Sequence, residues 1–201
     1  MKVDHAAFDG RLRARVQSGQ LDDAVADAIK VYGPEIYTLL VSIHRSHEDA
    51  NDVFSLFCEK VWKGLPRFEG RSSFRTWAYT IAWHASSTFR SREQARREEL
   101  ISDSQLGELA RQVRTETLSR LRNEKRSRLR ELRETLPAED QLLLVLRVER
   151  ELDWKDLSRV MNPDAELDED ALTRESARLR QRFQAVKQRL RALIQADASG
   201  V

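Results

Sequence analysis

The chain has 201 residues, enough for one large helical domain or two small ones. Hydrophobic residues make up 40% and charged residues 34%, with only 7 Gly and 4 Pro, which argues against sheets that need many turns. The amino-terminal residues lack the apolar core of a secretory signal, no apolar run reaches the roughly 18 residues of a membrane span, and a single cysteine cannot form an internal disulfide. We therefore expect a cytoplasmic protein without membrane insertion.

The net charge of +2 is small, but the charges are unevenly distributed. Residues 171–195 contain seven basic residues and one acid, whereas residues 162–170 contain five acids and no base. A basic segment of this kind is typical of a face that binds a polyanion, although a solvated charged helix is the alternative.

Three helices are predicted in the first 63 residues. The first covers Leu21–Val31, and Pro34 opens a second one to form a helical hairpin. Ser46, with Asp49 three residues later, resembles the start of a capping box and begins a third helix that runs to about Lys63.

Residues 64–73 combine Gly, Pro and Ser and are predicted to form a loop, with Ser72 or Ser73 capping the long helix that follows. The predicted buried stripe of that helix is Phe74, Trp77, Ala78, Ile81 and Ala85. Several aromatic, basic and polar side chains fall largely off this stripe: Tyr79, Trp83, His84, Ser87 and Arg90. They could hold unstacked bases by stacking and charge; alternatively, the two aromatic residues pack against a neighbouring helix.

Periodicity fades between Glu98 and Glu116, which predicts a linker with at most weak helix. Further helices are predicted before Leu136, after Pro137, from Asp153, and after the acidic segment 162–170. The last two helices fit a helix-turn-helix with a long connection, in which the final basic helix can enter a major groove. The predicted fold is all-α, with small helical domains at 1–97 and 117–201 joined by a flexible linker at 98–116.

Three segments resemble region two of the bacterial extracytoplasmic-function (ECF) sigma factors and occur in the order found there: EDANDVFSLFCEKVW, RFEGRSS and FRTWAYTIAWHASSTFRSR. Two further segments resemble region four of the same family: RELRETLPAEDQLLLVLRVERELDWKDLSRVM and LRQRFQAVKQRLR. This resemblance implies a region-two bundle and a region-four helix-turn-helix. It also implies a non-enzymatic factor that binds core RNA polymerase through the β′ clamp helices and the β subunit and directs initiation at promoter DNA.

The resemblance assigns three sets of residues. The helix after Ser46 would contact core polymerase through Asp49, Asp52, Ser55 and Glu59. The loop and the following helix would bind and melt the downstream promoter element through Phe68, Ser72, Ser73, Arg75, Tyr79, Trp83, His84, Ser87 and Arg90. The last helix would read the upstream element as duplex through Arg174, Arg178, Arg180, Gln181, Arg182 and Lys187.

Three features depart from the family pattern. Ser55 stands where many members carry Gln, and His84 stands where Asn is common. The region-four turn is extended by the acidic segment 162–170, which phosphate would repel, so we expect it to loop away from the duplex or to meet another protein. Members of the family are often held by an anti-sigma factor, which is therefore a further candidate partner.

No cofactor or metal is expected. His44 and His47 are three residues apart but have no third ligand near them in sequence, and Cys58 is predicted to be a small buried hydrophobe. Two other interpretations remain open. One is a helix-turn-helix regulator that does not bind core polymerase, and the other is a protein-binding helical module such as an anti-sigma-like adaptor.

Overall fold

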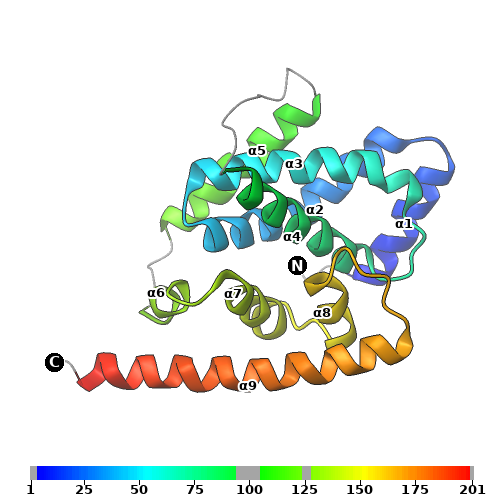
Figure 1. Ribbon diagram of the computed structural model, residues 1–201. Helices are drawn as coiled ribbons and strands as arrows, with labels where there is room; N and C mark the ends of the chain where they lie inside the picture. Colours follow the sequence, from blue (N-terminus) through cyan, green and yellow to red (C-terminus); the bar gives the residue numbers. More distant parts are fainter. Residues whose placement is uncertain (1–3, 94–104, 124–127, 200–201) are drawn as a thin grey trace.

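The computed structural model describes residues 4–93, 105–123 and 128–199, and these residues confirm the predicted all-α fold, with no strand among them (Figure 1). Two short segments, η1 (Leu65–Arg67) and η2 (Val145–Glu149), are a 3₁₀ turn and a π turn. The α-helices are α1 (His5–Gln17), α2 (Leu21–His44), α3 (His47–Gly64), α4 (Phe74–Glu93), α5 (Gln105–Asn123), α6 (Arg128–Glu134), α7 (Ala138–Leu144), α8 (Trp154–Met161) and α9 (Glu169–Ser199).

Helix α2 is the centre of the N-terminal bundle and is contacted by α1, α3, α4 and α5. The predicted break at Pro34 is wrong, because α2 continues through this residue. A proline inside a helix costs about 3 kcal/mol, but residues on several sides of α2, including Tyr32, Ile36 and Tyr37, are buried around it. Burial against four neighbouring helices therefore outweighs the local penalty.

The predicted linker is also partly wrong. Its residues 105–116 belong to α5, which packs against α2 and α3, and Ala110 and Val113 are buried there. The approach is close at Gly33, where an added Cβ would lie 3.1 Å from the Val113 side chain. Residues 98–104 of the predicted linker lie outside the described residues.

Three predicted helix starts are confirmed by their side-chain caps. The backbone N–H of Asp49 donates to the Ser46 hydroxyl at 3.2 Å, which begins α3. Ser73 caps α4, and Asp153 caps α8 by accepting from the backbone N–H of Asp156 at 2.8 Å. Each cap satisfies a backbone donor that the first helical turn leaves free.

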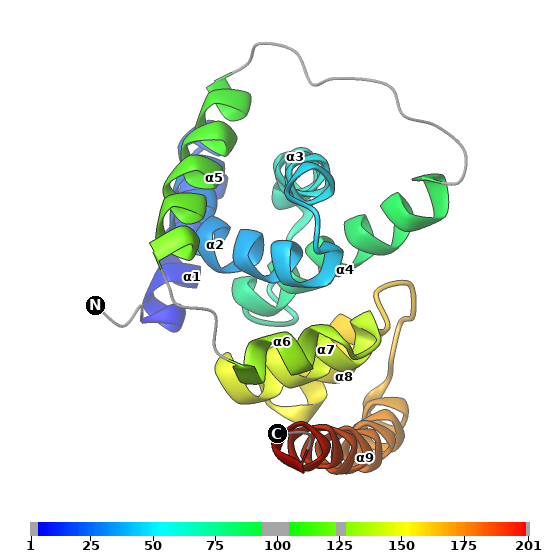
Figure 2. The ribbon, with the colours of Figure 1, turned by 90° about the vertical axis from the view of Figure 1, so that its left-hand side faces the viewer.

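The C-terminal helices lie below the N-terminal bundle in two tiers, α6, α7 and α8 first and then α9 (Figure 2). Leu179 and Val186, on the apolar side of α9, are buried. Leu143 and Leu157 of the C-terminal half belong to the same buried cluster as the core of the N-terminal bundle. The two halves are therefore packed against each other.

Candidate polymerase and nucleic-acid interfaces

The loop between α3 and α4 is built on aromatic packing. The Phe68 ring packs against those of Phe74 and Trp77, with centroids 5.7 and 5.1 Å apart. Gly70 has a φ of +71°, a conformation that favours glycine, and lies under the guanidinium of Arg13 from α1. The loop is therefore held against α4 by its aromatic ring and lies close to α1 at Gly70.

Helix α1, which the sequence analysis did not predict, supports this loop. The Asp9 carboxylate accepts a hydrogen bond from the backbone N–H of Phe74 at 3.0 Å and so fixes the start of α4. A hollow lies between α1 and the loop, lined by Leu12, Arg13, Val16, Gln17, Leu65, Pro66, Phe68 and Glu69. Arg13 and Gln17 are thus candidate site residues that sequence reasoning missed.

The second face of α4 carries the aromatic residues Tyr79 and Trp83, which were expected to hold unstacked bases or to pack against a neighbouring helix. Tyr79 is 0% exposed and Trp83 is 8% exposed, so the alternative is correct in this structure: both pack against neighbouring elements. Burial and the negative charge of Glu35 raise the pKa of Tyr79 above its ordinary value, which keeps the phenol neutral. Helix α8 covers this part of α4.

Arg75, predicted to contact the downstream element, is held by both halves of the chain. Its guanidinium donates to both carboxylate oxygens of Glu35, at 3.1 and 3.2 Å, and to the carbonyl oxygen of Arg150 at 2.9 Å. It also lies over the Tyr79 ring, 5.8 Å from the centroid. Arg75 is therefore occupied by internal partners.

The distal part of α4 carries the remaining predicted strand-binding residues. His84 Nε2 lies 3.3 Å from Asp164 Oδ1, which belongs to the acidic segment. The Arg90 guanidinium lies over the Trp83 ring, 5.6 Å from the centroid, and burial lowers its pKa. Ser87 is exposed. Asp164 of the acidic segment thus lies beside α4 of the same chain.

The predicted polymerase-contacting residues of α3 are unevenly covered. Asp52 is exposed, and burial together with the charges of Glu48 and Asp49 raises its pKa. Ser55 accepts a hydrogen bond from Arg114 of α5 at 2.8 Å. Asp49 and Glu59 are half-buried, and Glu59 pairs with Lys63. Helix α5 therefore lies beside the Ser55 edge of this face, a neighbour that the sequence pattern did not reveal.

The basic face of α9 is mainly exposed, as predicted. Its exposed members are Arg174, Arg178, Arg180 and Gln181. Arg178 forms an ion pair with Glu175 of the same helix at 3.0 Å. The Arg180 guanidinium lies 5.5 Å from the centroid of the Trp154 ring of α8. This face can meet phosphate or base edges without rearrangement of the helix.

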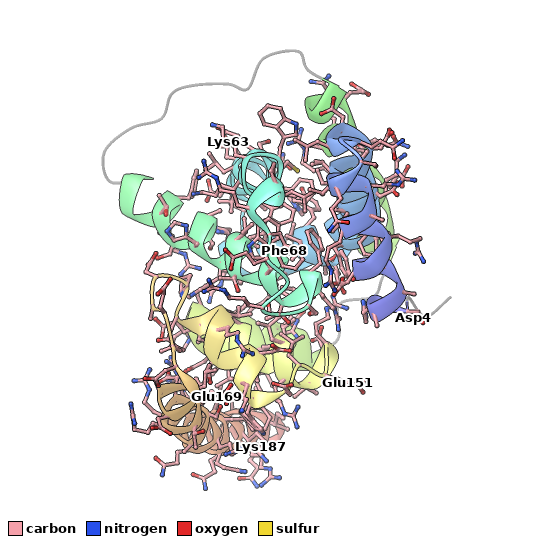
Figure 3. The ribbon with its side chains drawn as sticks, turned by 90° about the vertical axis from the view of Figure 1, so that its right-hand side faces the viewer. Asp4, Lys63, Phe68, Glu151, Glu169 and Lys187 are labelled. Carbon is pink, nitrogen blue, oxygen red and sulfur yellow. The ribbon has the colours of Figure 1, made fainter. Side chains whose placement is uncertain are left out.

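Two members of the predicted set face the protein. Arg182 forms ion pairs of 2.7 Å with Glu139 and Asp140 of α7, so its guanidinium is directed toward α7. Asp140 is buried and requires this partner. Lys187 lies over the Phe183 ring, 5.1 Å from the centroid. In Figure 3, Lys187 on α9 lies near the lower end of the molecule, well below Phe68 of the loop, which lies near the middle.

The histidines and the cysteine do not form a metal site in the parts of the chain that the structure describes. No group of three or more His, Cys, Asp or Glu side chains that could hold a metal ion occurs there. His44 Nε2 pairs with the Ser86 hydroxyl at 2.7 Å, and burial lowers the pKa of His44 to about 4. Cys58 is buried as predicted, and burial raises its pKa to about 12. Among these residues, no helix is both long and apolar enough to span a bilayer.

The comparisons with known proteins agree with this arrangement. Residues 28–97 match the family model for Sigma-70 region 2, a stretch that includes all the residues predicted for core polymerase and for the downstream element. Over 149 residues the chain is 30% identical to the RNA polymerase sigma factor YlaC of Bacillus subtilis (strain 168), an alignment that covers 69% of this chain and 80% of that relative.

These matches define the class of the protein as a helical factor of transcription initiation. The chain belongs to the RNA polymerase sigma factor family.

Proposed function

We propose that this chain is an ECF-type sigma factor that binds core RNA polymerase in the cytoplasm and directs initiation at specific promoters. The observation that carries the proposal is the combination, in one chain, of a region-two unit and a separate exposed basic helix. A sigma factor needs both, because it must hold a melted strand at one place and read duplex DNA at another.

The strand-binding surface in this proposal is the loop 68–73 together with α4. Unstacked bases are held by aromatic rings and cationic side chains, at about 1 to 3 kcal/mol per stacked base. Tyr79, Trp83, Arg75 and Arg90 lie on one side of α4 and would supply these groups once this side, where both aromatic rings are buried in the structure, is uncovered. Binding of bases exposed by melting supplies the free energy of strand opening, so no nucleotide hydrolysis is required.

The duplex-binding surface is the exposed N-terminal part of α9. Arg174, Arg178 and Gln181 are separated by four and three residues and therefore share one side of the helix. Arginine and glutamine side chains can contact base edges bidentately, which discriminates between bases by roughly 1 to 3 kcal/mol per pair, while other basic residues contact phosphate. Arg182 has a structural role in this proposal because α7 holds it.

Core polymerase would bind α3 through Asp52 and its neighbours. The acids Glu48 and Asp49 lie in the first turn of α3, where a negative charge is favourable next to the helix N-terminus. Since Asp52 is exposed and Ser55 is held by Arg114 of α5, we expect Asp52 to contribute more than Ser55 to this contact.

The test is transcription with purified components. The full chain is added to bacterial core RNA polymerase with a library of genomic fragments, and run-off transcripts are mapped at their starts. We expect defined start sites that share an upstream and a downstream sequence, and co-elution of the chain with core enzyme. A chain that bound duplex DNA but neither retained core enzyme nor initiated transcription would instead be a helix-turn-helix regulator.

A further inference from the structure

Helix α5 extends the N-terminal bundle beyond the segment that matches the family model, which ends at residue 97. It packs on α2 and α3, on the side of the bundle opposite α4 (Figure 2). Its side chains Ala110, Val113 and Thr117 are buried, and Val113 lies so close to Gly33 of α2 that an added Cβ there would be 3.1 Å away. Helix α5 is therefore an integral part of the bundle as well as a connection between the halves.

One side chain of α5 reaches the side of α3 that is proposed to bind polymerase. The Arg114 Nη1 donates to the Ser55 hydroxyl at 2.8 Å and to the carbonyl oxygen of Asn51 at 3.4 Å. Burial and neighbouring acids raise the pKa of Asp52, and the positive charge of Arg114 acts in the opposite direction, so the guanidinium lies near this carboxylate as well. Arg114 thus adds a cation to a surface that is otherwise acidic and polar.

The position of Arg114 leaves part of its guanidinium available to a partner. The side chain is half-buried, and only Nη1 is engaged by α3. A guanidinium carries several N–H donors in a rigid planar arrangement, so Nε and Nη2 can still donate. Within the ranges that the structure describes, neither of these nitrogens makes a hydrogen bond or an ion pair.

We propose that α5 forms part of the polymerase-binding surface and that Arg114 contacts core polymerase beside α3, through a carboxylate of the polymerase. The proposal rests on the function proposed for the chain and names the chemistry of one contact in it. A carboxylate fits because its two oxygens can accept from two guanidinium nitrogens at once. Since α3 already holds the arginine in place, little side-chain freedom is lost when the partner binds.

The proposal also gives a reason for one departure of α3 from the family pattern. Ser55 stands where many members carry Gln, and Asp52, Ser55 and Glu59 share one side of the helix because they are separated by three and four residues. A serine side chain is too short to reach a partner as a glutamine would. It can instead accept from Arg114, so that the N–H donors at this position come from α5.

The experiment measures the affinity of the full chain for purified bacterial core RNA polymerase. The chain carries a fluorophore at its amino terminus, and polymerase is titrated while fluorescence anisotropy is recorded. Arg114→Ala removes the guanidinium, and Ser55→Ala removes only the hydroxyl that accepts from it. The matched control is Arg111→Ala, which removes the same charge one turn earlier on α5, where the side chain pairs with Glu108. The thermal midpoint of each variant reports on stability.

We expect Arg114→Ala to weaken polymerase binding about tenfold, as for the loss of one charge-assisted hydrogen-bonded pair. Ser55→Ala should weaken it less, because the guanidinium is still present, and Arg111→Ala should change it less than about twofold. The double variant Arg114→Ala with Ser55→Gln returns an N–H donor to α3 and should recover part of the lost affinity. This recovery is a coupling between the two positions that a loss of stability alone would not produce.

Three results would overturn the proposal. Arg114→Ala could bind polymerase as tightly as Arg111→Ala, so that the guanidinium makes no contact. It could bind more tightly than the unchanged chain, which would mean that α5 competes with polymerase for α3. Finally, Ser55→Ala could lose as much affinity and stability as Arg114→Ala, without recovery in the double variant, which would leave Arg114 a structural role only.

The unchanged chain separates this proposal from the function on which it rests. If it neither binds core polymerase nor initiates run-off transcription, the proposed function fails. If it binds and initiates, but the substitutions at Arg114 have no effect on affinity, only the contribution of α5 to the polymerase-binding surface is rejected.

Discussion

The two proposed nucleic-acid surfaces of this sigma factor differ in chemistry and in exposure. The face of α4 is aromatic, Tyr79 and Trp83 are buried, and α8 packs against this helix. The face of α9 is basic, and Arg174 and Arg178 are exposed to water.

The difference follows from how each surface interacts with water. Arginine side chains are well solvated, so a duplex-reading face is stable while it is uncovered. Aromatic rings that stack on bases are apolar, and water favours their burial against whatever surface is available. A protein that carries a single-strand surface therefore gains stability from covering it when no DNA is bound.

The strongest test of this comparison is Trp83→Ala. Removing a buried tryptophan typically lowers the free energy of unfolding by about 3 to 5 kcal/mol, and Trp83 is almost fully buried. We expect a loss in this range by urea denaturation, while Trp83→Phe should retain part of the stability. A change below about 0.5 kcal/mol, the range of surface substitutions, would show that the aromatic face is open in solution.

Arg182→Ala should have the next largest effect. It leaves the buried Asp140 without its ion-pair partner, and an unsatisfied buried polar group costs about 1 to 3 kcal/mol. The thermal midpoint should fall accordingly, whereas Arg178→Ala, which breaks only an exposed pair with Glu175, should leave it nearly unchanged. Equal effects of the two substitutions would contradict the structural role of Arg182.

His44 is expected to limit stability in acid. Burial lowers its pKa in the folded protein from 6.5 to about 4, so between these values the unfolded chain binds a proton that the folded chain does not. The free energy of unfolding should therefore fall as the pH is lowered through this window. His44→Gln should reduce that loss, measured as the thermal midpoint between about pH 7 and about pH 4. His47→Gln, which changes an exposed histidine, should leave it unchanged.

The smallest effect on stability is expected for Arg174→Ala combined with Arg178→Ala, within about 0.5 kcal/mol. Binding should change instead: each lost phosphate contact lowers the slope of log affinity against log salt by about 0.9, so two contacts lower it by about 2. The control is Arg189→Ala with Arg191→Ala, which removes the same charge farther along α9. Identical slopes for both pairs of substitutions would mean that DNA binding depends on the total charge of α9 and not on one side of the helix.

Local features of the chain could be predicted from the sequence. Ser46, Ser73 and Asp153 cap α3, α4 and α8 as expected, because a cap depends on residues three positions apart. The burial of Leu179 and Val186 in α9 follows from the sequence, because one side of this helix is apolar and the other is charged. The region-two segment was recognised because its motifs are contiguous.

Features that depend on contacts between distant residues could not be predicted in this way. Helix α4 has apolar side chains on two sides, and the sequence alone does not show that the second side, with Tyr79 and Trp83, is covered by α8. The cluster of Glu35, Arg75 and Arg150 joins residues that are far apart in the chain. Pro34 and the weakly periodic α5 were misassigned because tertiary packing outweighs local propensity there.

The docking of α5 on α2 and α3 also sets the reach of the chain between its two DNA-contacting parts. As a helix, the 19 residues of α5 span about 28 Å, since each residue rises 1.5 Å. Unwound and fully extended, the same residues could bridge roughly 60 Å. Detachment and unwinding of this one helix would therefore about double the distance that the tether can cross, so a single chain could accommodate contact sites at different spacings along a DNA molecule.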